Sequence, residues 1–201
     1  MDTAVLTVHK GRLRVLLVHA DKAERLPGTF LHPDETLKAA ALRALRDKAG
    51  VQGLDPQQLR VFDRPDRDDR GWVLSVAHLD AVRADQIPAN ENTRLVAVDE
   101  VPRLSFDHAE IVQHAASTLR AQYRDRPDPW RLLAASTEGF TIRDLRLLHQ
   151  TVLGEQLVAD TFRRTMLPHL VPLGATRRGA RGKPAELFLT ASTPAAAGPE
   201  L

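Results

Sequence analysis

The hydrophobic residues in the first half of the chain fall into short β-branched runs separated by polar turns. Residues 4–20 (AVLTVHKGRLRVLLVHA) contain two such runs on either side of Lys10-Gly11, a pattern that predicts a β-hairpin. A charged loop divides residues 59–82 into two further runs, and residues 93–101 (TRLVAVDEV) contribute a short one. We therefore expect this region to supply the strands of a sheet.

Two other segments of the same region have helical spacing. Residues 36–49 place three apolar side chains on one helix face, namely Leu37, Ala41 and Leu45. A second apolar stripe runs through residues 109–123, and Asp107 followed by Glu110 resembles a capping box in front of it. Strands mixed with helices indicate a mixed α/β domain.

The stretch RAQYRDRPDPWRLL interrupts this pattern. It places two prolines among charged residues between periodic segments, which predicts a domain boundary near residues 124–130. We therefore expect a first domain over residues 1–126 and a second over residues 130–190. The small, proline-rich tail, residues 191–201, is expected to be disordered.

The second domain has a different order of elements. A short helix is expected over residues 130–135, and Thr141 with Asp144 predicts the capped start of a second helix. Asp160 is expected to cap a third helix, and VPLGATRRGARGKPAELFLT gives strand, basic glycine-rich loop and strand. Three helices followed by a hairpin with a basic tip is the order of a winged helix-turn-helix.

The composition excludes several classes of protein. The chain has no cysteine, which excludes disulfides and thiolate metal sites and is typical of the cytoplasm, where we expect the protein to be. Its apolar runs are shorter than the roughly 20 residues that span a bilayer, and its start lacks the pattern of a signal peptide. We therefore expect no membrane association.

The charge is unevenly distributed along the chain. The whole chain has a net charge of only +2, yet residues 161–183 hold six basic residues and no acidic one. A local cationic patch on a nearly neutral protein suggests a polyanionic partner. A solvated surface loop without a partner is the alternative.

The segment LPGTFLHPDETLKAAALRALRDKAGV, residues 26–51, resembles the Nudix box of hydrolases that cleave nucleoside diphosphates linked to another moiety. That pattern is Gly, five residues, Glu, seven residues, Arg-Glu, apolar, any, Glu-Glu, any, Gly, apolar. The chain matches it at Glu35, Arg43, Leu45, Gly50 and Val51. It departs from it at Thr29, which replaces glycine, and at Ala44, Asp47 and Lys48, which replace glutamates.

The three missing glutamates decide the predicted chemistry. Positions 44, 47 and 48 share one helix face, which in the hydrolases presents carboxylates to Mg²⁺. The metal neutralises the diphosphate and helps to activate water. A methyl group at Ala44 and an ammonium at Lys48 cannot do this, so we expect no metal site, no catalytic residues and no enzyme activity. A fold retained without its ligands for the metal is what a nucleotide sensor would show.

The whole chain resembles the Nudix-related transcriptional repressors of NAD metabolism. Besides the box, the resemblance rests on RPDRDDRGWVLSVAHL, SFDHAEIVQHA, FTIRDLRLLHQTVLGEQLVADTFRRTML and RRGARGKPAELF. It implies an α+β protein in which a mixed-sheet α/β/α sandwich of the Nudix type precedes a winged helix. It further implies a homodimer that represses NAD-biosynthesis genes at operator DNA, uses no cofactor, and is released by ADP-ribose or a related nucleotide.

Candidate site residues follow from both patterns. For DNA, a residue set on the third helix and the basic loop is expected to contact bases and phosphates: Thr161, Arg163, Arg164, Arg177, Arg178, Arg181 and Lys183. For the effector, we expect residues of the box and of the charged loop: Glu35, Arg43, Asp47, Lys48, Arg67 and Arg70.

Other interpretations stay open at the level of sequence. The alternatives are an active Nudix hydrolase with a displaced metal site, a sugar-responsive regulator of the same architecture, and a winged-helix module that binds protein. The histidines form no spaced metal cluster, and Trp72 and Trp130 are interpreted as packing residues.

Overall fold

The computed structural model describes residues 1–20, 23–68, 70–133, 138–178 and 183–191. The chain divides into two compact units, Met1–Gln122 and Tyr123–Leu201. Among the described residues, no helix has the length and apolar character needed to cross a membrane.

The first unit is built on a six-stranded mixed sheet. Its strands are β1 (Asp2–His9), β2 (Arg12–Ala20), β3 (Ala23–Arg25), β4 (Gln57–Phe62), β5 (Ser75–Ala81) and β6 (Thr93–Ala97). The order is β3-β2-β1-β5-β4, with β6 also paired to β2. β1 and β5 run parallel, and the other pairs are antiparallel.

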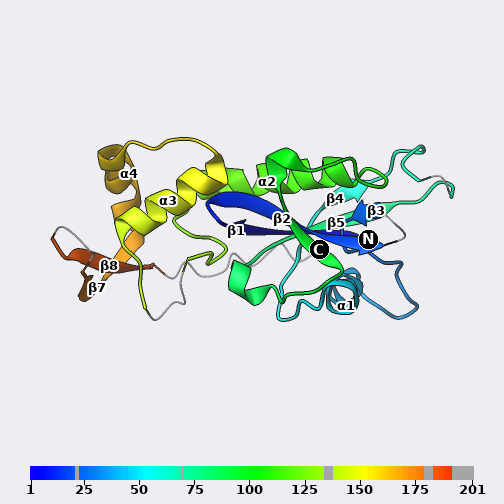
Figure 1. Ribbon diagram of the computed structural model, residues 1–201, viewed down its shortest axis with the longest axis horizontal. Coiled ribbons are helices and arrows are strands. Elements are labelled where there is room, and N and C mark those ends of the chain that lie inside the picture. Colours follow the sequence, from blue (N-terminus) through cyan, green and yellow to red (C-terminus); the bar gives the residue numbers. More distant parts are fainter. Residues whose placement is uncertain (21–22, 69, 134–137, 179–182, 192–201) are drawn as a thin grey trace. The chain divides into compact units, whose positions relative to one another are not determined.

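One helix covers each face of this sheet (Figure 1), α1 (Leu37–Ala49) on one side and α2 (His108–Asp125) on the other. Leu45 and Ala49 of α1 join Val5 of β1 in one buried cluster. The central strand β1 is buried on both sides from Thr3 to Thr7, because a helix covers each face of the sheet. The predicted α/β/α sandwich is confirmed.

Local signals in the sequence place the ends of these elements. Lys10 and Gly11 both have positive φ (51° and 71°), as the predicted two-residue hairpin turn requires. Thr36 caps α1 by accepting a hydrogen bond from the Ala39 N–H (3.1 Å), and Gly50 ends the helix in the left-handed region (φ 69°).

The capping box predicted in front of α2 has other partners in the structure. Both carboxylate oxygens of Asp107 accept hydrogen bonds from Arg67, at 2.8 and 2.6 Å. The Glu110 carboxylate accepts from Arg60 (2.6 Å). The helix was predicted correctly from its apolar stripe, while its two first acidic side chains bind arginines of the β4–β5 region.

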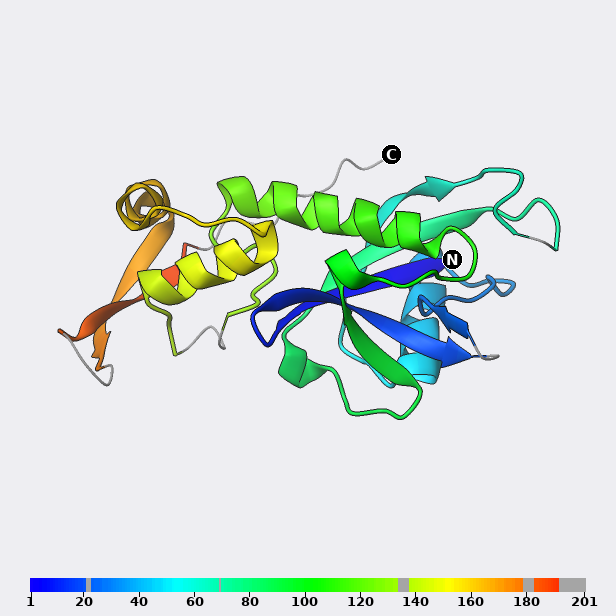
Figure 2. The same ribbon diagram turned by 45° about the horizontal axis from the view of Figure 1, so that its top comes forward.

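The second unit contains α3 (Ile142–Leu153), α4 (Ala159–Met166) and a two-stranded sheet of β7 (Leu170–Arg177) and β8 (Ala185–Thr190), as Figure 2 shows. Its core joins all four elements and consists of Phe140, Leu145, Phe162, Met166, Leu170 and Phe188. Helix-turn-helix followed by a hairpin confirms the predicted winged helix.

Thr141 and Asp144 form the predicted capping box of α3, with hydrogen bonds of 3.1 and 3.0 Å. The predicted cap of α4 was wrong: the N-cap is Val158, which has extended backbone and whose carbonyl accepts from the Phe162 N–H (2.9 Å). Asp160 lies in the first turn instead, where a carboxylate is favoured by the helix dipole.

The short helix predicted over residues 130–135 is also wrong for its described part. The Asp128 carboxylate accepts hydrogen bonds from the Leu132 and Leu133 N–H groups (3.0 Å each) and from the Tyr123 hydroxyl (2.6 Å). Arg131 has a left-handed φ of 54°. A buried side chain has taken the backbone donors that a helix would need.

Candidate functional site

The face of α1 that would hold a metal in a Nudix hydrolase has no suitable ligands in this chain. The Ala44 methyl group is only 2% exposed and belongs to the core. The Asp47 carboxylate pairs with Arg46 (2.8 Å), and the Lys48 ammonium donates to the Gly28 carbonyl. Mg²⁺ needs several hard oxygen ligands, so these residues do not fit it. Among the described residues, no group of three or more potential ligands is arranged to hold a metal.

Glu35 and Arg43 of the box bind each other. Two parallel hydrogen bonds of 2.8 Å join the guanidinium to the carboxylate, and Arg43 also donates to the Thr29 hydroxyl (3.2 Å) and the Phe30 carbonyl (3.0 Å). The hydrogen bonds from Arg43 lower the pKa of Glu35 to about 2. This pair fixes the loop before α1 onto the helix.

A cavity of about 160 Å³ lies beside this loop. Its wall comes from the start of β1, the segment after β3, α1, the β4–β5 loop and the start of α2: Met1, Asp2, Arg25, Leu26, Gly28, Thr29, Phe30, Lys48, Arg67, Asp68, Arg70, Val73, Phe106 and His108. Of the predicted effector residues, Lys48, Arg67 and Arg70 therefore line one cavity. Glu35, Arg43 and Asp47 are outside its described lining.

A buried polar network forms the floor of the cavity. The Leu26 N–H donates to His108 Nδ1 (3.0 Å), so the ring proton is on Nε2, which lies 3.2 Å from the Asp2 carboxylate. Burial alone would raise the pKa of Asp2, but hydrogen bonds from His108 and Ser75 hold it below its usual value. Arg67, paired with Asp107, lies 3.7 Å from the same carboxylate.

The rim of the cavity carries a cation between two exposed aromatic rings. The Arg70 guanidinium carbon lies 5.2 Å from the centre of the Phe30 ring and 5.3 Å from that of Phe106. Asp68 holds this guanidinium with two hydrogen bonds, of 2.8 and 2.6 Å. The rings are 59% and 40% exposed, so a planar group can reach them from solvent.

Sequence reasoning missed the aromatic and buried members of this site. Phe30 lies within the box segment, and Phe106 and His108 lie within SFDHAE. The signal that could have indicated this site was a phenylalanine in each of these two polar segments. Trp72, interpreted as a packing residue, is 76% exposed, so that interpretation was wrong.

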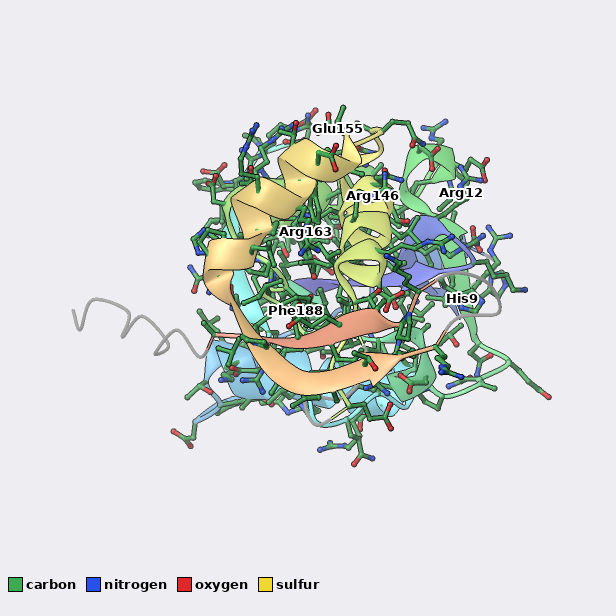
Figure 3. The ribbon with its side chains drawn as sticks, turned by 90° about the vertical axis from the view of Figure 1, so that its left-hand side faces the viewer. His9, Arg12, Arg146, Glu155, Arg163 and Phe188 are labelled. Atoms are coloured by element: carbon green, nitrogen blue, oxygen red, sulfur yellow. The ribbon has the colours of Figure 1, made fainter. Side chains whose placement is uncertain are left out.

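In the second unit, α4 exposes the predicted contact residues. Phe162 and Met166 are buried on one side, and Thr161, Arg163 and Arg164 are exposed. Figure 3 shows Arg163 on α4. The exposed side therefore presents two guanidinium groups and a hydroxyl, which suit base edges and phosphates.

The turn between α3 and α4 is fixed by polar side chains. Arg146 donates to the Leu157 carbonyl (3.0 Å), and the Gln150 side-chain oxygen accepts from the Leu157 N–H (3.1 Å). This arginine of α3 thus has a structural function, unlike the arginines exposed on α4.

The basic residues of the hairpin differ in their surroundings. Arg177 binds Asp144 (3.2 Å) and the Gly139 carbonyl (3.0 Å), which ties β7 to the start of α3. Arg178 and Lys183 are exposed, and Arg181 lies outside the described residues. A basic hairpin beside the helix-turn-helix has the chemistry of a DNA-binding wing.

Comparison with known proteins identifies both units. Residues 2–115 match the NUDIX domain, and residues 135–189 match the NrtR DNA-binding winged helix domain. The chain is 28% identical to the ADPR responsive transcriptional repressor NtrR of Acinetobacter baylyi, over 94% of this chain and 80% of that one.

Similar solved structures include two of Shewanella oneidensis NrtR. Shewanella oneidensis NrtR complexed with a 27mer DNA has a TM-score of 0.77 and 28% identity, covering 94% of this chain and 92% of that one. The NUDIX domain of S. oneidensis NrtR complexed with ADP ribose has a TM-score of 0.52 and 28% identity, covering 59% and 85%. The chain therefore belongs to the NUDIX family and joins its NUDIX domain to an NrtR DNA-binding winged helix domain.

Proposed function

We propose that this chain is a DNA-binding transcriptional repressor that leaves its operator when the NUDIX domain binds ADP-ribose. The observation that carries the proposal is the combination, in one chain, of a cationic cavity unsuited to Mg²⁺ with a winged helix whose second helix exposes arginines. The similarity to an ADPR responsive repressor and to a DNA-bound NrtR supports both halves.

The cavity matches the chemistry of ADP-ribose, which has a planar base and a charged diphosphate. We assign the diphosphate to Lys48 and Arg70 and the base to the rings of Phe30 and Phe106. Arg67 is paired with Asp107 and holds the buried polar side chains at the floor of the cavity in place. Glu35 and Arg43 act indirectly by fixing the loop, and Asp47 lies beyond the described lining.

The same arrangement argues against hydrolysis of the ligand. Without carboxylates facing the cavity from α1, the described residues offer no site for the metal that activates water in the hydrolases. We expect turnover of ADP-ribose far below the roughly 1 s⁻¹ of a slow enzyme.

The winged helix is assigned to operator DNA. Thr161, Arg163 and Arg164 would face the major groove, while Arg178 and Lys183 of the wing would contact phosphates. We further propose a homodimer in which two winged helices bind half-sites about one helical turn apart. The target genes would be those of NAD biosynthesis, as the resemblance implies.

The test is a binding titration with operator fragments selected from genomic DNA by the protein itself. Fluorescence anisotropy should show that ADP-ribose releases the DNA, whereas NAD and simple pentoses serve as comparison ligands. Release by a pentose but not by ADP-ribose would assign the chain to sugar-responsive regulation. Rapid cleavage of the phosphoanhydride bond of ADP-ribose with Mg²⁺ or Mn²⁺ would assign it to the hydrolases.

A further inference from the structure

The three positions that are glutamates in the hydrolase pattern lie in three different environments. Ala44 is in the core, and Asp47 is at the surface with Arg46. Lys48 alone lines the described cavity, so the position that reaches the ligand carries a cation in place of an anion.

The Lys48 ammonium is held in place at the wall. It donates to the Gly28 carbonyl, and Gly28 itself forms a β-bridge with Asp2 at the start of β1. A Cβ added at Gly28 would lie 2.1 Å from an Asp2 carboxylate oxygen and 2.6 Å from the Met1 carbonyl oxygen. An ammonium carries three N–H donors and can serve more than one acceptor, so a lysine held at a backbone carbonyl can also donate to a phosphate.

The charges of the wall favour an anion. The lining includes four basic side chains, Arg25, Lys48, Arg67 and Arg70, and two carboxylates, Asp2 and Asp68. Both carboxylates already accept charge-assisted hydrogen bonds: Asp68 from Arg70, and Asp2 from His108 and Ser75. A dication would therefore meet a net positive wall, whereas a diphosphate would meet complementary charge.

We propose that this cavity binds the diphosphate of its ligand without a divalent metal, and that the Lys48 ammonium supplies the positive charge that Mg²⁺ supplies in Nudix hydrolases. The inference rests on the proposed function, because ADP-ribose is taken as the ligand. It extends that function by stating how the phosphates are recognised and by making sensing independent of the metal.

The experiment is calorimetric titration of the full chain with ADP-ribose, once with excess EDTA and once with millimolar Mg²⁺. The affinity should be the same in both buffers. Lys48→Met keeps an unbranched chain of similar length and removes the charge, so it should weaken binding about tenfold or more. Lys48→Arg keeps a cation and should retain part of the affinity.

Lys38→Met is the matched control, because Lys38 lies on the same helix and pairs with Asp55 at the surface. It should bind ADP-ribose like the parent chain, and circular dichroism should show that all variants are folded. Binding that requires Mg²⁺, or a Lys48→Met variant with unchanged affinity, would overturn the inference and leave the proposed function standing. Failure to bind ADP-ribose in either buffer would reject the proposed effector itself, and the inference with it.

Discussion

Arg70 lies between the rings of Phe30 and Phe106. Both rings are open to solvent, so a nucleobase can stack on them. If the base stacks on Phe30, truncating this ring removes a contact of about 1–3 kcal/mol. Phe30→Ala should therefore weaken ADP-ribose binding by about fivefold or more in a calorimetric titration. Leu31→Ala is the control, because Leu31 is the neighbouring exposed apolar residue and is not part of the described lining. Equal affinities for the two variants would place the base elsewhere.

His149 connects stability of the winged helix to pH. The side chain is buried against the rings of Tyr123 and Phe162, and burial lowers its pKa, although Nε2 donates to the Pro127 carbonyl (2.6 Å). The unfolded chain therefore binds the proton more readily below about pH 6.5. The contribution of His149 to stability is complete above this pH and is lost as the pH falls from there through the lower pKa of the folded state.

The effect can be measured by urea unfolding followed through Trp130 fluorescence in a Trp72→Phe background. The free energy of unfolding should decrease between neutral pH and about pH 5.5, and His149→Gln should reduce this decrease. His169→Gln, at an exposed position of the same unit, should retain the parental pH dependence. Identical slopes for His149→Gln and the parent would show that another group is responsible.

At the scale of elements, the sequence predicted the helices whose signals are local. Thr36 and Gly50 delimit α1, and Thr141 with Asp144 begins α3, so each boundary is determined by side chains within the element. The failed helix near residue 130 depended on Asp128, whose burial next to Tyr123 cannot be deduced from spacing.

The candidate site could be predicted only in part for the same reason. Lys48, Arg67 and Arg70 were found because they are charged residues in a recognised segment or loop. The floor depends on long-range contacts such as that from Leu26 to His108, which are 82 residues apart. The packing of α2 against the sheet brings such segments together, and the periodicity of the sequence carries no information about this packing.

The helix α4 and the wing should make separable contributions to DNA binding. Arg163→Glu with Arg164→Glu removes two exposed cations without touching the core, so specific binding should be lost while the fold is kept. Neutral substitutions at both positions should make the slope of the logarithm of the DNA-binding constant against the logarithm of the salt concentration less steep. The expected change is about 0.9 per lost phosphate contact. Anisotropy at several salt concentrations measures this, with Arg103→Glu, an exposed residue of the first unit, as the control for net charge.

Within the wing, Arg177 and Arg178 should behave differently. Arg178→Ala removes an exposed charge, so it should lower DNA affinity alone. Arg177→Ala also removes the bonds to Asp144 and Gly139, so it should lower the thermal stability of the winged helix as well. Unchanged stability of Arg177→Ala would show that these bonds are replaced by water.

For the whole molecule, effector and operator binding must be linked in both directions. If ADP-ribose weakens operator binding by a given factor, operator DNA must weaken ADP-ribose binding by the same factor. Such coupling is typically about 5–150-fold. Titrating ADP-ribose into the free protein and into its operator complex measures the factor independently of DNA release. Unequal factors would mean that the two ligands do not share one equilibrium, for example because the protein also changes its oligomeric state.

The buried methyl group of Ala44 constrains the evolutionary paths open to this chain. Restoring a glutamate at this position would press a carboxylate into the core before any metal could pair with it, and an unpaired buried charge is strongly destabilising. A chain that packs an alanine here could hold a metal-binding carboxylate at this position only if the surrounding core were repacked at the same time.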